Sequence, residues 1–230
     1  MLATMAVIHH RRSTRVYLER TPRRTFAMAI DWPGWGRSGK TPEAALAALA
    51  DYAPRYARVT ALAEVDFPAA TGEDLEILEE LAGNATTEFG APAAVASIDS
   101  EPYDAETARL TAALLRGSWA ALEEVAASSP AELRKGPRGG GRDRDKMLEH
   151  VLGAEVAYAG KIGVKIRQPA LGDAAAIAAA RGAILAVVGA ESPGGPARPN
   201  GWPVRYAARR LAWHALDHAW EMEDRRDTAP

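Results

Sequence analysis

Apolar residues alternate with small or polar residues between positions 15 and 32, and this two-residue period is typical of β-strands. One face of the second half carries four large apolar side chains, Phe26, Met28, Ile30 and Trp32. The turn-forming residues 21–24 (TPRR) divide the segment into 15–19 and 25–32. The pattern therefore predicts two strands joined by a turn, each with one apolar face directed to a core.

A glycine-rich loop at residues 33–40 ends this alternation. Thr41 then precedes Pro42 and Glu43, an order typical of a helix start: a capping hydroxyl, a proline where its missing N–H is not needed, and an acid in the first turn. We expect one helix from there to about residue 57. Residues 75–81 fit either a short helix or a strand, and we favour a strand because two strands alone would be marginally stable. Residues 94–100 are interpreted as a linker.

From residue 104 onward, apolar positions recur every three or four residues, as they do in amphipathic helices. The predicted helices cover residues 104–127, a segment that begins at Asp143 or Asp145, residues 173–189, and residues 203–225. Four such helices in one continuous segment most simply pack as an up-down bundle. The chain is therefore predicted to be α+β: a small N-terminal antiparallel sheet-plus-helix domain over residues 1–102, followed by a C-terminal up-down four-helix bundle over residues 103–230.

Composition narrows the choice of partners and of chemistry. The chain has 230 residues, 47% of them hydrophobic and 25% charged, with a net charge of −2, which is typical of a globular protein and favours neither nucleic acid nor a membrane as partner. It has no cysteine, so disulfides, thiolate metal sites and a cysteine nucleophile are excluded. Any metal must be held by histidine, aspartate or glutamate.

The N-terminal residues 1–12 and the basic loop at residues 135–144 are interpreted as neither a signal peptide nor a nucleic-acid site. The basic cluster at residues 9–12 follows the apolar residues 1–8, which is the reverse of a signal peptide, and no run approaches the ~20 apolar residues of a membrane span. We therefore expect a cytoplasmic protein. The basic loop at residues 135–144 lacks interleaved aromatic residues and is interpreted as a solvated loop able to attract an anionic substrate.

Three of the five histidines fall within predicted helices. His214 and His218 are four residues apart and therefore share one helix face, and the pattern of the second predicted helix directs His150 inward. Three neutral imidazoles can hold one divalent metal and leave a coordination position open, as catalytic sites do. Zn²⁺ is the first expectation and Ni²⁺ the second.

Three acidic residues are candidates for catalytic roles near these histidines. Asp217 and Glu221 flank the histidine pair on the last helix and are candidate acceptors that fix the imidazole tautomers. Glu155 follows His150 on the second helix and is a candidate general base. The alternative interpretation is that the histidines form hydrogen bonds to these carboxylates and serve only packing.

Two segments, 149–155 (EHVLGAE) with Tyr158, and 209–221 (RRLAWHALDHAWE), resemble the DinB-like, YfiT-like superfamily of metal-binding four-helix bundles. The resemblance covers residues 104–230 and implies a metal held by His150, His214 and His218. It also implies a metal-dependent hydrolase or low-molecular-weight-thiol transferase that acts on a small molecule. Arg209 and Arg210 are candidates to receive a thiol cofactor's carboxylate, although solvated arginines are the interpretation we favour.

The segment 14–60 resembles the HicB-like antitoxin domain in its two strands, its Pro-Gly turn at residues 33–36 (PGWG) and its helix start at residues 41–46 (TPEAAL). This resemblance supports an alternative function: a non-catalytic regulatory or binding protein, in which the bundle is a scaffold or a metal sensor. A homodimer is compatible with either function.

Residues 34–41 also satisfy the phosphate-loop pattern G-x-x-x-x-G-K-[ST]. The preceding strand alternates, whereas a phosphate-loop strand is usually buried on both faces, and Pro42 removes a donor that a phosphate would need. Nucleotide binding is therefore the third and weakest hypothesis.

Overall fold

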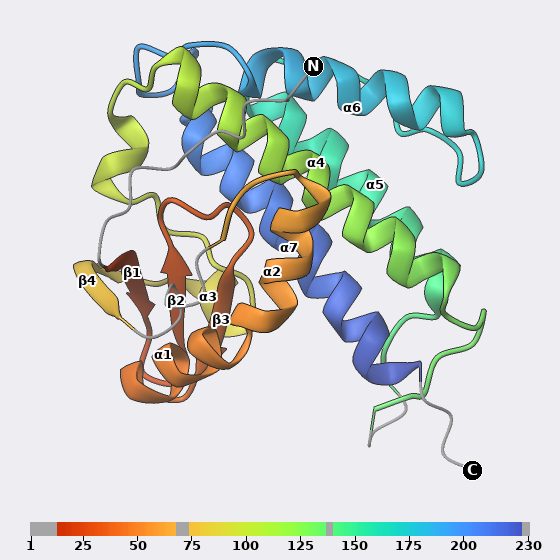
Figure 1. Ribbon diagram of the computed structural model, residues 1–230, viewed down its shortest axis with the longest axis horizontal. Helices are drawn as coiled ribbons and strands as arrows, with labels where there is room; N and C mark the ends of the chain where they lie inside the picture. Colours follow the sequence, from red (N-terminus) through yellow and green to blue (C-terminus); the bar gives the residue numbers. More distant parts are fainter. Residues whose placement is uncertain (1–12, 68–73, 137–139, 227–230) are drawn as a thin grey trace.

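The computed structural model describes residues 13–67, 74–136 and 140–226 (Figure 1). The expectation of no signal sequence at residues 1–12 lies outside these ranges, as does the part of the basic loop at residues 137–139. Within the described residues, a four-stranded sheet belongs to the N-terminal half, and most of the seven α-helices belong to the C-terminal half. The predicted α+β class is confirmed at this level.

The sheet has the strand order β3-β2-β1-β4. The predicted strand pair is β1 (Thr14–Arg20) and β2 (Thr25–Ala29), which run antiparallel with Tyr17 opposite Met28. β4 (Leu75–Ala82) is the strand expected near residue 75, but it pairs with β1 in parallel. The prediction of an antiparallel sheet was therefore wrong, because the helices between β3 and β4 form the crossover that a parallel pair requires.

The glycine-rich loop contains a strand that the apolar pattern did not predict. β3 (Gly36–Gly39) pairs antiparallel with β2, and a Cβ at Gly36 would meet the side chain of Met28. At Gly34 the φ angle is +95°, and a Cβ would lie 2.7 Å from Leu216. These glycines allow close packing. Because β3 occupies Gly36–Gly39, the middle of the phosphate-loop pattern is a strand and not a loop.

The predicted helix at residue 42 is two helices. Thr41 caps α1 (Pro42–Asp51) by accepting a hydrogen bond from the backbone N–H of Ala44, as expected. The helix ends before Tyr52, and α2 (Ala53–Leu62) then begins with Pro54 in its first turn. Proline is tolerated only in the first turn of a helix, so Pro54 favours a break at this point. The expected linker contains a short helix, η2 (Ser97–Ser100), and is preceded by α3 (Ala85–Phe89).

The four C-terminal helices lie where the apolar pattern predicts them: α4 (Ala105–Ala127), α5 (Arg144–Lys161), α6 (Ala174–Val188) and α7 (Val204–Arg225). Asp104 and Asp173 cap α4 and α6 by accepting backbone N–H groups. α7 contacts α4, α5 and α6, and α4 also contacts α6. Within the described part of the chain, no helix has the length and apolar character needed to cross a membrane.

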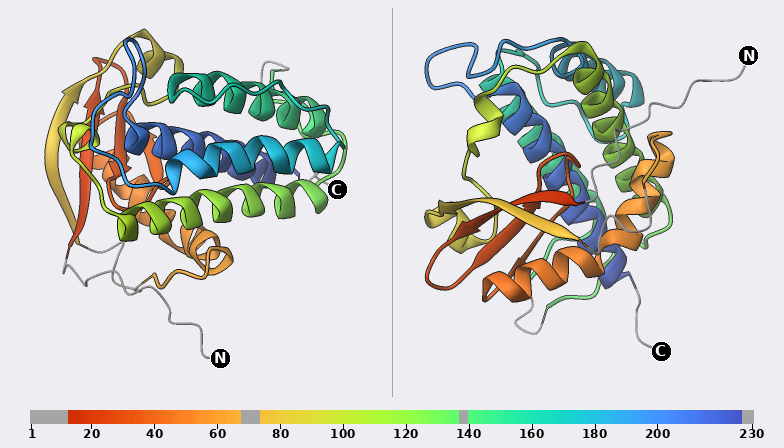
Figure 2. Two further views of the ribbon diagram at one scale, coloured as in Figure 1. Left: turned by 90° about the horizontal axis from the view of Figure 1, so that it is seen from above. Right: turned by 60° about the vertical axis from the view of Figure 1, so that its left-hand side comes forward.

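α7 is buried nearly all round because it lies between the sheet and the other long helices (Figure 2). On one side, Trp213 packs edge-on against Phe26 of β2, with ring centroids 5.9 Å apart, and Leu216 joins the core beneath β1. On the other side, Ala207, Leu211 and Ala215 belong to the core shared with α4, α5 and α6. The two halves of the chain therefore meet along α7, and α2 of the N-terminal half also packs against α4.

Candidate metal centre

The three predicted ligands come together where α5 packs against α7. His150 lies on α5, and His214 and His218 occupy successive turns of α7. One ring nitrogen from each lies within 4.8 Å of the other two. His214 and His218 are each 8% exposed, while His150 is half-buried. The residues described by the structure therefore place all three imidazoles around one point, close enough to bind a metal ion.

The Nε2 atoms of His150 and His214 are 3.2 Å apart. Two imidazole nitrogens bound to one tetrahedral zinc ion, at about 2.0–2.1 Å each, lie about 3.3–3.4 Å apart. The observed separation therefore fits two nitrogens directed at a shared ion. Without an ion, one of the two rings must donate a proton to the other.

The surroundings keep at least two of the rings in the neutral form that a metal requires. Burial lowers the pKa of His214 to about 2, with further contributions from the charges of His218 and Arg210. Burial also lowers the pKa of His150, and Arg142 lowers it further. Both rings consequently have a free nitrogen lone pair at neutral pH.

Of the three candidate catalytic carboxylates, Glu221 is the one that forms a hydrogen bond to a histidine of the cluster among the described residues. Its Oε2 lies 3.0 Å from Nδ1 of His218, and its Oε1 accepts a hydrogen bond of 2.6 Å from Arg225. These bonds lower the pKa of Glu221, with His218 as the largest cause. A carboxylate acceptor at Nδ1 holds the proton there and leaves Nε2 of His218 available as a ligand.

Asp217 and Glu155 have other partners. Oδ1 of Asp217 accepts a hydrogen bond of 3.2 Å from Arg37 of β3, and burial raises the pKa of this carboxyl group. Glu155 lies on a different face of α5 from His150 and accepts two hydrogen bonds, of 3.2 and 3.1 Å, from Arg181 of α6. Among the described residues, neither carboxylate forms a hydrogen bond to the three histidines.

Two arginines at the start of this region are buried, so the interpretation of Arg209 and Arg210 as solvated was wrong. Arg209 is 2% exposed and donates a hydrogen bond of 2.5 Å to Asp99 of η2. Arg210 is 8% exposed and lies one turn before His214. The apolar pattern could not place them inside, because Arg209 contacts Asp99 of η2 and Tyr17 of β1 and Arg210 contacts Tyr158 of α5, all from distant parts of the sequence.

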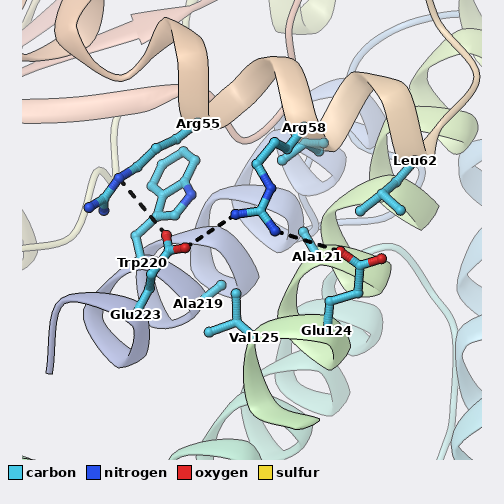
Figure 3. Close-up of a pocket in the computed structure, with 10 residues that line it drawn as sticks. Arg55, Arg58, Leu62, Ala121, Glu124, Val125, Ala219, Trp220 and Glu223 are labelled. Atoms are coloured by element: carbon cyan, nitrogen blue, oxygen red, sulfur yellow. Dashed lines mark hydrogen bonds and ion pairs between the residues drawn. The ribbon is translucent and has the colours of Figure 1, made fainter. Parts of the chain in front are cut away.

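A cleft between α2, α4 and α7 is a separate feature (Figure 3). It is lined by Trp220 and by charged residues that pair with one another: Arg58 lies 3.2 Å from Glu223 and 3.9 Å from Glu124. None of the three clustered histidines lines it. Because its charges are mutually compensated, we assign the candidate site to the histidine cluster.

No protein-family model, curated protein or solved structure matches this chain. The features that mark a functional site are the geometry of the histidine cluster and the groups around it.

Proposed function

We propose that the protein is a divalent-metal-dependent enzyme whose metal is held by His150, His214 and His218. The observation that supports this proposal most strongly is the convergence of three ring nitrogens within 4.8 Å of one another. We also propose that α4, α5, α6 and α7 form an up-down four-helix bundle of the DinB-like kind. Zn²⁺ is the proposed ion and Ni²⁺ the next candidate, since imidazole ligands suit both.

Three protein ligands leave one coordination position for a substrate or for water. A bound divalent ion would supply Lewis acidity, which favours either hydrolysis by water or transfer of a low-molecular-weight thiol to a small-molecule electrophile. In both reactions Glu221 orients His218 through its Nδ1 atom. Asp217 and Glu155 remain predicted catalytic groups, and each would have to act from within its present ion pair.

One observation favours the second candidate function, a non-catalytic regulatory or binding protein with a HicB-like N-terminal domain. Each of the three candidate catalytic carboxylates is already paired with an arginine: Glu155 with Arg181, Asp217 with Arg37, and Glu221 with Arg225. A general base must accept a proton from the reacting group, and a competing cation weakens its basicity. Turnover of an amide or thiol adduct that is lost in His150→Ala would exclude this alternative.

Elemental analysis of protein purified without an affinity tag tests the metal centre directly. We expect about one divalent ion per chain, with loss of the ion in His150→Ala, His214→Ala and His218→Ala. His9 and His10 are the other two of the five histidines, so the double variant His9→Ala/His10→Ala is the matched control and should retain the ion. A native protein without stoichiometric metal, and with metal content unchanged in His218→Ala, would refute the proposal.

A further inference from the structure

Arg210 is a buried cation without a hydrogen-bond or ion-pair partner in the described part of the chain. Its side chain is 8% exposed, and among the described residues it forms neither an ion pair nor a hydrogen bond. Its Nη1 atom is shielded from solvent and has no acceptor within the described ranges. The two other buried arginines in the described ranges each have a carboxylate: Arg181 pairs with Glu155, and Arg209 with Asp99. Buried cations are rarely left unpaired, so the missing acceptor calls for an explanation.

A second unpartnered donor lies beside the first. The guanidinium carbon of Arg210 is 4.8 Å from the ring centre of Trp213 and 5.3 Å from that of Tyr158. Trp213 is 3% exposed, and its indole N–H also lacks an acceptor among the residues that the structure describes. Contact with the aromatic rings offsets part of the desolvation of the cation, but it provides no acceptor for either N–H group. Within the described segments, each of the two N–H groups therefore lacks an acceptor of the kind that an anion supplies.

This donor pair adjoins the histidine cluster. The ring of Tyr158 lies 5.8 Å from that of His214, and the ring of Trp213 lies 6.3 Å from it. The charge of Arg210 acts on His214, and the exposed Arg142, which also has no ion pair among the described residues, acts on His150. Two uncompensated cations and two aromatic side chains therefore border the proposed metal centre.

We propose that Arg210, together with the indole N–H of Trp213, binds the carboxylate of the small-molecule substrate that reacts at the histidine cluster. A guanidinium group matches the two oxygens of a carboxylate, and Tyr158 and Trp213 offer apolar contact to the carbon atoms attached to it. This inference rests on the proposed function, since it names the substrate class of that site: a carboxylate joined to an apolar or aromatic group. The carboxylate belongs either to the electrophile or to a thiol co-substrate.

Benzoate and its uncharged analogue benzamide are suitable probes for the full-length protein, studied by ¹⁵N–¹H spectra of the indole groups. The chain has six tryptophans, and Trp213→Phe identifies the resonance of Trp213. We expect benzoate to shift this resonance downfield and benzamide to leave it in place, both in metal-loaded and in chelator-treated protein. Arg210→Gln should weaken benzoate binding by about tenfold or more, and Arg210→Lys by less, since lysine keeps the charge but not the paired donors.

Arg116→Gln is the matched control, because Arg116 is an exposed arginine on α4 without an ion pair among the described residues. Its benzoate affinity should equal that of the unaltered protein. A Trp213 resonance insensitive to benzoate, or equal affinities in Arg210→Gln and Arg116→Gln, would overturn the inference and indicate that Arg210 is satisfied by water alone. The chelator-treated sample separates this outcome from failure of the metal site, which would instead appear as absence of bound metal.

A third probe identifies the source of the carboxylate. In metal-loaded protein, 3-mercaptopropionate should bind more tightly than propionate if the carboxylate belongs to a thiol, because its sulfur would occupy the open position. Equal affinities would assign the carboxylate to the electrophile. In either case, Arg210→Gln should weaken the binding of both compounds. Binding that is unaffected by Arg210→Gln would contradict the inference.

Discussion

Nδ1 of His218 and Oε2 of Glu221 lie 3.0 Å apart, one turn from each other on α7. The carboxylate therefore fixes the tautomer of a proposed metal ligand from within the same rigid helix. Since Arg225 holds the other oxygen of Glu221 at 2.6 Å, the carboxylate is itself oriented. The last two turns of α7 thus contain both the ligand and the groups that position it.

Replacing Glu221 with glutamine should reduce metal affinity by about 10–100-fold, because an amide is a weaker acceptor for the Nδ1–H of His218 and stabilises its orientation less. Competition with a chelator of known affinity measures this change. Glu223→Gln is the control on the same helix, since Glu223 pairs with Arg58 and should have no effect on affinity. Equal affinities in the two variants would show that the contact of Glu221 with His218 is unimportant for metal binding.

The ion pair between Asp99 and Arg209 should be important for stability. Asp99 is 1% exposed and Arg209 is 2% exposed, so removal of the carboxylate leaves a buried cation. We expect Asp99→Ala to lower the free energy of unfolding by about 3–5 kcal/mol, as measured by urea denaturation. The double variant Asp99→Leu/Arg209→Met should recover much of this loss, because it removes both charges. A loss below about 1 kcal/mol in Asp99→Ala would contradict this expectation.

The sequence predicts elements that depend on local chemistry. Thr41 and Asp104 cap helices where their positions before an apolar repeat indicate, and the spacing of His214 and His218 places both on one face of α7. Convergence with His150 follows from the inward face of a second helix. Helix capping and apolar periodicity are properties of a few neighbouring residues, so they can be predicted from the sequence without knowledge of tertiary contacts.

Features that depend on contacts between distant segments cannot be predicted from local sequence in this way. β3 consists of Gly36–Gly39 and has no apolar alternation, so its pairing with β2 is visible only in the structure. The parallel pairing of β4 depends on the path of α1 and α2. Arg210 is buried because α7 is covered from both sides, and charged side chains usually indicate a solvated face. The sequence therefore offers Arg210 as a candidate to receive a carboxylate, whereas its burial without an acceptor among the described residues is visible only in the structure.

Tyr103 should make the protein sensitive to alkaline pH. Its hydroxyl donates to the carbonyl of Val188 at 3.0 Å, and burial raises its pKa from 10.0 to about 12. Because the folded state holds this proton more strongly, its contribution to stability is fully present below pH 10 and is lost as the pH rises towards 12. We expect Tyr103→Phe to be less stable by about 1 kcal/mol at neutral pH, with a difference that shrinks above pH 10. Urea denaturation at a series of pH values measures this, and a constant difference would contradict it.

Gly117 and Gly182 offer a matched pair of glycine-to-alanine substitutions in helices. A Cβ at Gly117 of α4 would lie 2.5 Å from the carbonyl oxygen of Val59 on α2, so the two helices would have to move apart. Gly182 of α6 is exposed, and no atom of the described neighbouring residues lies within 4 Å of its added Cβ. Alanine favours a helix by about 1 kcal/mol over glycine, whereas overpacking costs about 1–3 kcal/mol. We therefore expect Gly182→Ala to raise the melting temperature and Gly117→Ala to lower it. Stabilisation by both substitutions would show that the contact between α2 and α4 is loose enough to accept a methyl group.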